Sequence, residues 1–376
     1  MKILVFAHRP PPLHGQSYMV GEMLDGFARR PELGVRCVHV DARVSTDLAN
    51  VGRAGLSKLV RLARNVRRAC QLQREERCDA FYYIPAPGQR NPLYRDWLAL
   101  PWLRRALPVE IFHWHSCGLG TLLREQARPW ERRLSTRILG HHALSLVHST
   151  ASDPGLVDLH PRRILSVPNG IPDPLAAPGM PARSPVPGRL LFLGLCCREK
   201  GLFDALEAVA QLNRSAPGRH HLDIGGGFPD EATRAEFAAR VARPDLQGAV
   251  TYHGFVQPDA KARLWAAAEA FVFPTFYGPE SMPLVLLEAM AWGVPIVTTR
   301  WRSLPEFLPP GYPGIVAPHA PGEVAEAVRR VVAREPGPAL RRHFEAEFTL
   351  ERHLEKLAAA CRSVLAVPSG PSAKIG

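Results

Sequence analysis

Several features that would place this 376-residue chain in a special structural class are missing from its sequence. No apolar run approaches the roughly 18 to 20 residues of a bilayer-spanning helix, so an integral membrane protein is not expected. The apolar start, residues 1–7, runs directly into His8 and Arg9 without a cleavage site, so export is not expected either. The seven cysteines are odd in number and form no Cys-x-x-Cys pair, which argues against a disulfide framework or a zinc ribbon and favours a reducing cytoplasm.

Acidic residues are scarce in one half of the chain. Residues 1–172 contain 25 Lys and Arg against 14 Asp and Glu, whereas the remaining residues contain 22 against 21. This net charge of +11 attracts anions, whether phosphate groups, nucleic acid or an acidic lipid surface. We expect the anionic partner to meet the N-terminal half.

The hydrophobic content of 46% is that of a folded protein with a sizeable core, and its pattern predicts an α/β fold. Short β-type runs alternate with helical-period stretches, which predicts parallel strands in doubly wound sheets. Six prolines are spread over residues 172–188, a density that predicts an extended linker with no regular element. The expected organisation is an N-terminal domain 1–172, a linker 173–188, a C-terminal domain 189–349, and a segment 350–376 whose helix packs back on the N-terminal domain. The two domains are expected to enclose a cleft, lined by loops at the carboxyl ends of the strands.

The segment 274–295 carries the most informative pattern. A strand ends at Pro274, a loop carries Glu280, and a helix begins near Pro283 and contains Glu288. Helix N-termini attract anions, so a diphosphate is expected there, and the two carboxylates would meet different parts of one extended ligand. In the alternative interpretation Glu280 is a helix-end charge and Glu288 a solvated side chain.

Two further loops offer groups suited to a diphosphate. Arg198 and Lys200 follow one strand and precede a helix, so both are expected to reach the ligand, unless they are ordinary surface cations. The Gly225-Gly226-Gly227 run lacks the third glycine of a dinucleotide fingerprint and is interpreted as a close-approach turn beside the nucleotide.

His113 and His115 stand at the end of a strand in the N-terminal half. Residues two apart on a strand point to the same face, so either side chain is expected in the cleft. A metal site would need further ligands, and the neighbouring sequence supplies none. A structural histidine is the alternative.

The segment around Glu280 and Glu288 resembles the Glu, seven residues, Glu signature of retaining nucleotide-sugar glycosyltransferases of family 4. Other pieces are similar in the same order between Ile3 and about Leu365: the N-terminal glycine loop at residues 11–17, with His14 in place of the usual first glycine, the interdomain Pro-Asn-Gly element at 167–171, and the Arg/Lys-Gly phosphate clamp at 198–202. The resemblance implies a GT-B fold of two facing Rossmann-like domains.

The resemblance also implies an activity: transfer of a hexose from a UDP- or GDP-sugar to an acceptor, with retention at the anomeric carbon. No Asp-x-Asp triplet occurs, so cations and helix N-termini are expected to replace Mg²⁺, with no metal and no cofactor. The implied catalytic residues are Glu280, His115, Arg198 and Lys200. The implied donor-binding residues are Gly15, Arg198, Lys200, Gly226, Ser281, Met282, Pro283, Leu284 and Glu288. The acceptor-side candidates are His14, His113 and Asn169.

A basic amphipathic helix is predicted within residues 53–77. Its cations are candidates for contact with an anionic membrane, and the opposite stripe of Leu56, Leu59, Val60, Ala63, Val66 and Cys70 would be apolar. The candidate membrane contacts are Lys58, Arg61, Arg64 and Arg68. A solvated face over a core stripe explains the pattern equally well. Tyr94, Trp97 and Trp102 form either an interfacial patch or buried helix packing.

These features favour a lipid-linked glycan acceptor, a role in bacterial surface polysaccharide assembly, and a cytoplasmic protein peripheral on the inner face of the plasma membrane. Two alternatives stay open: a GT-B relative such as a sugar-nucleotide epimerase or phosphorylase, and a basic nucleic-acid-binding protein. The sequence has no helix-turn-helix, RNP or zinc-finger pattern, so no nucleic-acid partner is expected.

Overall fold

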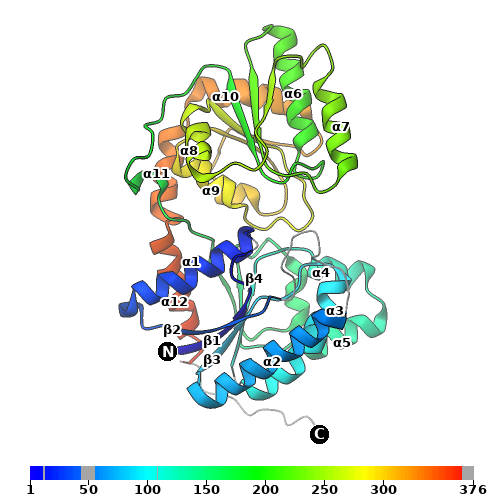
Figure 1. Cartoon of the computed structure of the whole chain (residues 1–376), viewed down its shortest axis with the longest axis vertical. Helices are drawn as coiled ribbons and strands as arrows, with labels where there is room; N and C mark the ends of the chain where they lie inside the picture. Colours follow the sequence, from blue (N-terminus) through cyan, green and yellow to red (C-terminus); the bar gives the residue numbers. More distant parts are fainter. Residues whose placement is uncertain (12, 44–55, 108, 366–376) are drawn as a thin grey trace. The chain divides into compact units, whose positions relative to one another are not determined.

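The structure, a computed structural model, describes residues 1–11, 13–43, 56–107 and 109–365. The chain divides into two compact units (Figure 1). The first contains residues 1–169 and the chain from Leu350 onward, and the second is Gly170–Thr349. The division therefore falls after Asn169, and the proline-rich stretch belongs to the second unit. That stretch was expected to lack regular structure, but Asp173 caps a short 3₁₀ helix, η5 (Pro174–Ala176), by accepting a hydrogen bond from Leu175 N–H.

The first unit is built on a parallel six-stranded sheet in the order β2-β1-β3-β4-β5-β6. Its strands are β1 (Lys2–Ala7), β2 (Arg36–Asp41), β3 (Ala80–Tyr83), β4 (Glu110–Trp114), β5 (Leu144–Val147) and β6 (Ile164–Ser166). Its α-helices are α1 (Gly15–Arg29), α2 (Leu56–Glu76), α3 (Arg90–Ala106), α4 (Leu119–Thr121), α5 (Pro129–Leu139) and α12 (Leu350–Arg362). Shorter turns are η1 (Pro31–Leu33), the π-helical η3 (Leu122–Gln126) and η4 (Pro154–Leu159). The strand β6 is short and only partly buried, and it was not expected from the sequence.

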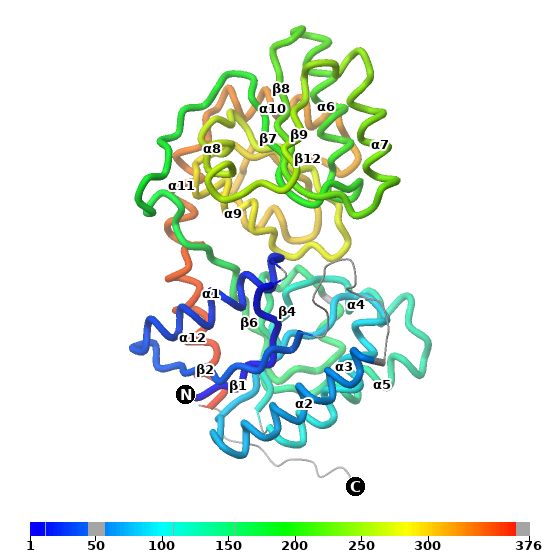
Figure 2. Tube along the Cα trace, viewed as in Figure 1, coloured from blue at the N-terminus to red at the C-terminus, as the bar shows by residue number. Residues whose placement is uncertain are grey.

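Helices cover both faces of this sheet. One face packs its strand residues against α1 and α12, and the other packs against α2, α3 and α4. The helices α1 and α12 are far apart in the sequence but lie against each other (Figure 2). A Cβ at Gly26 of α1 would overlap Leu354 of α12, so the glycine permits this close packing.

The second unit repeats the architecture with a parallel sheet in the order β12-β11-β10-β7-β8-β9. Its strands are β7 (Arg189–Leu193), β8 (His221–Gly225), β9 (Val250–Tyr252), β10 (Ala270–Phe273), β11 (Ile296–Thr299) and β12 (Ile315–Val316). Its helices are α6 (Leu202–Ser215), α7 (Glu231–Val241), α8 (Pro258–Ala267), α9 (Leu284–Ala291), η6 (Leu304–Phe307), α10 (Pro321–Arg334) and α11 (Gly337–Glu347).

The predicted class, two doubly wound parallel α/β sheets, is confirmed. Strands such as β3, β5, β10 and β11 are buried along their whole length, as expected when helices flank a parallel sheet. All carboxyl ends of such a sheet lie at one edge, and this edge is where side chains from distant loops meet.

Candidate active site

In the second unit, Lys200 and Glu280 meet at the carboxyl edge of the sheet. Lys200 lies between β7 and α6, and Glu280 follows β10, which is the neighbour of β7. Lys200 Nζ is 2.6 Å from Glu280 Oε2, and only 15% of the lysine and 7% of the glutamate side chain is exposed. Thr275 Oγ1 donates a second hydrogen bond to Glu280 Oε2 at 3.2 Å, and Lys200 Nζ lies 4.5 Å from the centroid of the Tyr277 ring. The structure thus brings together two of the four residues expected to be catalytic.

The helix that follows Glu280 begins where the sequence predicted. Pro283 is the N-cap of α9 and Leu284 its first residue, while Ser281 and Met282 just before them are buried. Leu286 N–H donates a hydrogen bond to Pro283 O. The N–H groups of the first turn lie before the point where the regular hydrogen bonds within the helix begin. This end of α9 therefore combines a positive helix terminus with the ammonium group of Lys200.

Glu288 has a separate cation. It lies inside α9, and its Oε1 is 2.6 Å from Nζ of Lys261 on α8, with 22% of Glu288 and 32% of Lys261 exposed. Lys261 could not be identified from the sequence, because nothing in the spacing along the chain shows that α8 lies beside α9. Each carboxylate of the Glu-to-Glu pair is thus held by its own lysine.

Arg198 has a partner other than the one expected. Its guanidinium pairs with Glu236 of α7 and lies over the Phe203 ring, 4.8 Å from the centroid, and the side chain is exposed. Of the two cations predicted to act together, the structure places only Lys200 against Glu280. Chain spacing put Arg198 in the correct loop but did not fix the direction of its side chain.

The turn after β8 lies close to the loop after β7. Gly226 has φ of +146°, and a Cβ there would overlap the backbone oxygen of Gly194 in the loop after β7. Nothing lies within 4 Å of the equivalent position at Gly227. The backbone conformation and the contact both require glycine at Gly226.

In the first unit, His14 caps α1, whose first residue is Gly15. His14 Nδ1 accepts a hydrogen bond from Ser17 N–H at 3.3 Å, and Ser17 Oγ accepts one from His14 N–H at 3.0 Å. This capping box explains how a histidine replaces a glycine at the loop. Burial, with a smaller contribution from His8, lowers the pKa of His14 to about 4, so the ring is neutral near pH 7.

His113 and His115 lie beside a third histidine at the carboxyl edge of the first sheet. The parallel register pairs Trp114 with Val147, so His115 after β4 lies opposite His148 after β5. One ligand nitrogen from each of the three rings lies within 4.8 Å of the others. The expectation that His113 and His115 have no further ligand nearby is therefore wrong. The missing signal was that a histidine directly follows each of the two β-type runs, because neighbouring parallel strands end at one edge.

The surroundings of this group keep the rings uncharged. Tyr82 Oη and His113 Nδ1 are 2.5 Å apart, and the buried Asn169 side chain hydrogen-bonds to His148. Burial lowers the pKa of His148 to about 3, and burial together with the neighbouring imidazoles lowers the pKa of His113 and His115 well below the usual value. His115 is partly exposed as a residue, but its Nε2 atom is buried.

The basic helix α2 differs from its predicted face. Its buried residues are Leu62, Val66 and Ala69, whereas Leu59 and Val60 of the expected apolar stripe are exposed. Ala63 of that stripe is exposed as well, and residues before Leu56 lie outside the described residues. The predicted stripe was right for Val66 and wrong for Leu59, Val60 and Ala63, because the sequence does not show which side of a helix meets the sheet.

The helices α2 and α3 of the first unit thus expose both cations and apolar side chains. Arg61, Arg64 and Arg68 are exposed on α2 and Lys58 is partly exposed. On α3, which packs beside α2 (Figure 1), Trp102 is 62% exposed and Leu98 54%. We call Lys58, Leu59, Val60, Arg61, Arg64, Arg68, Leu98 and Trp102 the basic apolar face. Trp97 instead packs between Tyr94 and Trp130, with centroid distances of 4.8 and 5.8 Å. In the described part of the chain, no helix is long and apolar enough to span a membrane.

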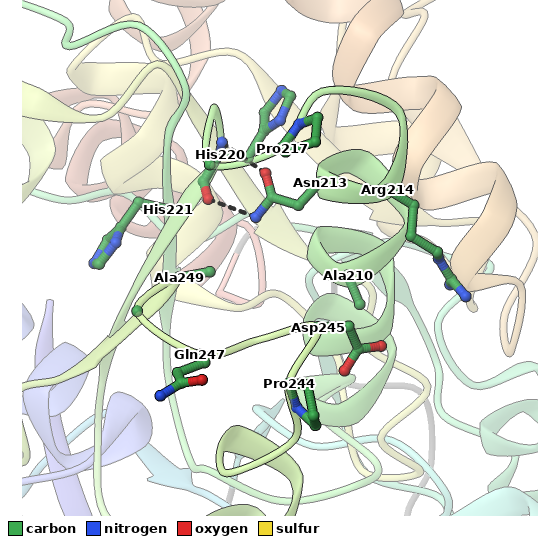
Figure 3. A pocket seen from close by; sticks show the side chains of 12 residues that line it. Ala210, Asn213, Arg214, Pro217, His220, His221, Pro244, Asp245, Gln247 and Ala249 are labelled. Atoms are coloured by element: carbon green, nitrogen blue, oxygen red, sulfur yellow. Dashed lines mark hydrogen bonds between the residues drawn. The ribbon is translucent and has the colours of Figure 1, made fainter.

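A surface pocket of about 310 Å³ lies elsewhere in the second unit (Figure 3). It is lined by the end of α6 and by residues before β8 and β9, including Asn213, His220, Asp245 and Gln247. The Asn213 side chain exchanges two hydrogen bonds of 2.9 Å with the His220 backbone. This pocket lies at the amino ends of the strands, and none of the predicted site residues lines it.

Comparison with solved structures defines the fold class. The chain is similar to sucrose-phosphate synthase from Thermosynechococcus elongatus, with a TM-score of 0.70 and 19% identity over 97% of this chain and 99% of that one. It is also similar to HepE of Anabaena, solved in complex with UDP, with a TM-score of 0.69 and 17% identity over 96% and 100% of the two chains. The chain has the GT-B fold, as predicted.

Comparison with protein families is more specific for the second unit. The family model described as glycosyl transferases group 1 matches residues 187–334, which lie in the second unit. O-antigen chain mannosyltransferase B of Escherichia coli is 34% identical over 132 residues, which are 35% of this chain and 32% of the relative. Glycogen synthase of Mycobacterium tuberculosis is 35% identical over 158 residues, or 42% and 36% of the two chains. The chain spans about a third of the length of these curated relatives.

Proposed function

We propose that this protein is a retaining glycosyltransferase of family 4 that transfers a hexose from a UDP- or GDP-sugar to a glycan acceptor. The observation that carries the proposal is the buried Lys200–Glu280 pair at the N-terminal end of α9. It lies at the carboxyl edge of a doubly wound sheet, within the residues matched by the glycosyl transferases group 1 model.

The proposed donor site follows from the charges at this edge. The first turn of α9 and the Lys200 ammonium supply the positive charge that a diphosphate needs. Glu280 accepts a hydrogen bond from a sugar hydroxyl, and Glu288, farther along α9, binds the ribose. Gly226 lets the turn after β8 lie close to the loop after β7, which leaves room for the nucleotide. Arg198 leaves its partner Glu236 and binds the diphosphate.

The proposed reaction breaks the bond between the anomeric carbon and the diphosphate oxygen and forms a bond to the acceptor oxygen on the same face. The proton of the acceptor hydroxyl passes to the departing diphosphate. Lys200 and the α9 N-terminus stabilise the negative charge that grows on this leaving group. We propose that the donor diphosphate is held in this way without a divalent ion.

The first unit supplies the proposed acceptor side. His115 hydrogen-bonds to the transferred sugar, with Gly15 at the start of α1 and the candidates His14, His113 and Asn169 nearby. Because burial lowers the pKa of His14 and His115, these rings act as neutral hydrogen-bonding groups and not as cations.

The nature of the acceptor is proposed from the relatives and from the surface. Relatives over part of the chain include an O-antigen chain mannosyltransferase and an amylovoran biosynthesis glycosyltransferase, which supports a role in bacterial surface polysaccharide assembly. The basic apolar face combines cations with an exposed tryptophan, the chemistry of a peripheral contact with anionic lipid. A lipid-linked glycan at a membrane surface is therefore the proposed acceptor.

Donor binding and transfer can be tested separately. Thermal shift against UDP, GDP and their sugars identifies the base, because a ligand of the folded state raises the melting temperature. With that donor, we expect transfer to an acceptor glycan to survive EDTA and to fall by about 100-fold or more in Glu280→Gln. The control Glu231→Gln changes an exposed carboxylate of α7 and should leave the rate unchanged.

Product analysis with labelled donor distinguishes the proposal from its relatives in chemistry. A new glycosidic bond with the donor's anomeric configuration supports retaining transfer. An isomerised nucleotide sugar or a sugar phosphate would identify an epimerase or a phosphorylase instead. Full activity of Glu280→Gln would reject the assignment of the site.

A further inference from the structure

The proposed transfer does not require the group formed by His113, His115 and His148. We call these three residues the histidine cluster. Hydrogen bonding to one sugar needs a single imidazole, yet the sheet edge gathers three. In the part of the chain that the structure describes, no other group of three or more metal-ligating side chains lies this close together. We propose that the histidine cluster is a binding site for a borderline transition-metal ion of the Zn²⁺ type.

The geometry is close to that of a three-histidine site. Nitrogen ligands of a tetrahedral zinc ion lie about 3.3 Å apart because Zn–N bonds are about 2.0–2.1 Å long. The three ligand nitrogens lie within 4.8 Å of one another. Their separations would have to shorten by about 1.5 Å or less to match those around a zinc ion. The β4–β5 register fixes the spacing of the His115 and His148 backbones, so the cluster does not depend on long flexible side chains.

Two ring nitrogens in the cluster lack another role among the described contacts. His113 Nε2 and His115 Nε2 are buried and have no hydrogen-bond partner in the described part of the chain. A buried polar atom without a partner costs free energy, and a bound metal ion would satisfy both at once.

The outer contacts match those of metal-bound histidines. His113 Nδ1 is 2.5 Å from Tyr82 Oη, so an Nδ1–H that donates to the tyrosine leaves the Nε2 lone pair for the metal. His148 hydrogen-bonds to the Asn169 side chain. Such partners fix the tautomer and orientation of the rings in metal sites.

The donor set also selects the class of ion. Three imidazoles and no carboxylate suit Zn²⁺, Co²⁺ or Ni²⁺, whereas Mg²⁺ and Ca²⁺ prefer oxygen ligands. His115 is the one partly exposed member of the cluster, while His113 and His148 are buried. This ion is therefore distinct from the Mg²⁺ that clamps a diphosphate in other enzymes.

One consequence rests on the proposed function. His115 is the residue proposed to contact the transferred sugar, so a bound metal would occupy it and lower the transfer rate. Metal binding itself is independent of transfer, so the experiment below can fail without affecting the proposed function.

The test uses the full-length protein without a histidine tag. Co²⁺ is titrated by its visible absorption and Zn²⁺ by competition with a chromogenic chelator. We expect one ion per chain and no competition from excess Mg²⁺ or Ca²⁺. Removal of one ligand in His148→Ala should weaken Zn²⁺ binding by at least about 100-fold, and Tyr82→Phe, which removes only the outer contact, by about 10- to 100-fold.

The matched control is His141→Asn. His141 is exposed, stacks on His160 in the same unit, and has a positive φ that asparagine tolerates. The affinity of the His141→Asn variant for Zn²⁺ should equal that of the wild type. Far-UV circular dichroism checks the fold of each variant. If His148→Ala does not fold, the test rests on Tyr82→Phe and on an anomalous-scattering map of wild-type crystals at the zinc edge. Absence of stoichiometric binding by the wild type, unchanged affinity in the cluster variants, or an anomalous peak elsewhere would overturn the proposal.

Discussion

The buried pair of Lys200 and Glu280 gives a prediction whose size follows from burial. Lys200→Met keeps the length of the side chain but removes the ammonium group 2.6 Å from the carboxylate. The remaining carboxylate would keep only the hydrogen bond from Thr275 among the side-chain contacts described for it. Breaking a buried ion pair by removal of one partner costs about 3–5 kcal/mol. Since Thr275 remains, we expect the lower end, about 3 kcal/mol of unfolding free energy.

The same helix offers a matched control with the same distance and less burial. Lys261 and Glu288 are also 2.6 Å apart, but 32% and 22% of their side chains are exposed. Lys261→Met should therefore cost at most about 1 kcal/mol. For a unit of this size, the two costs correspond to falls in melting temperature of about 6–12 °C and about 2–4 °C or less.

Differential scanning calorimetry of the full chain measures both falls. A double-mutant cycle then isolates the pair: Glu280→Gln combined with Lys200→Met leaves no buried unpaired charge, so the double variant should lose less stability than the two single variants together. Equal costs for Lys200→Met and Lys261→Met, or additive losses in the cycle, would refute the argument from burial.

Three further predictions concern the backbone, pH and the surface. Gly226→Ala should destabilise the chain by about 1–3 kcal/mol in denaturant titration, and Gly227→Ala much less; equal effects would contradict the close approach. Burial lowers the pKa of His142 to about 4. As pH falls from 6.5 to 4, the unfolded chain binds a proton at this residue and the folded chain does not, so the free energy of unfolding falls by up to about 3 kcal/mol. His142→Gln should flatten that pH dependence of the melting temperature, and an unchanged slope would exclude the residue as its source. Trp102→Ala and Arg64→Gln should each weaken flotation with anionic vesicles, by about 1 kcal/mol for the cation lost in Arg64→Gln. Equal binding to neutral vesicles or in high salt would refute the membrane contact.

Local patterns determined the architecture and part of the site. Alternation of β-type runs with amphipathic stretches was sufficient for two doubly wound sheets, because periodicity reports which face of an element is buried. The order strand, loop, helix from Pro274 to Leu284 placed Glu280 correctly before α9. Lys200 was found in the same way, since its loop also follows a strand of the parallel sheet.

The structure alone decided which of these side chains meet. Glu236 faces Arg198 and Lys261 faces Glu288 because of the order in which helices pack on the sheet, which spacing along the chain does not specify. The buried face of α2 depends on the strand beneath it for the same reason.

The histidine cluster shows the limit most directly. The sequence placed His113 and His115 at a strand end, but His148 joins them only because β4 and β5 are neighbours in register. Residues at the ends of strands are visible in the sequence, whereas the order of strands within a sheet is set by tertiary packing of the whole unit. Composition and periodicity thus determined the elements, and the assembled sheets determined the chemistry at their edges.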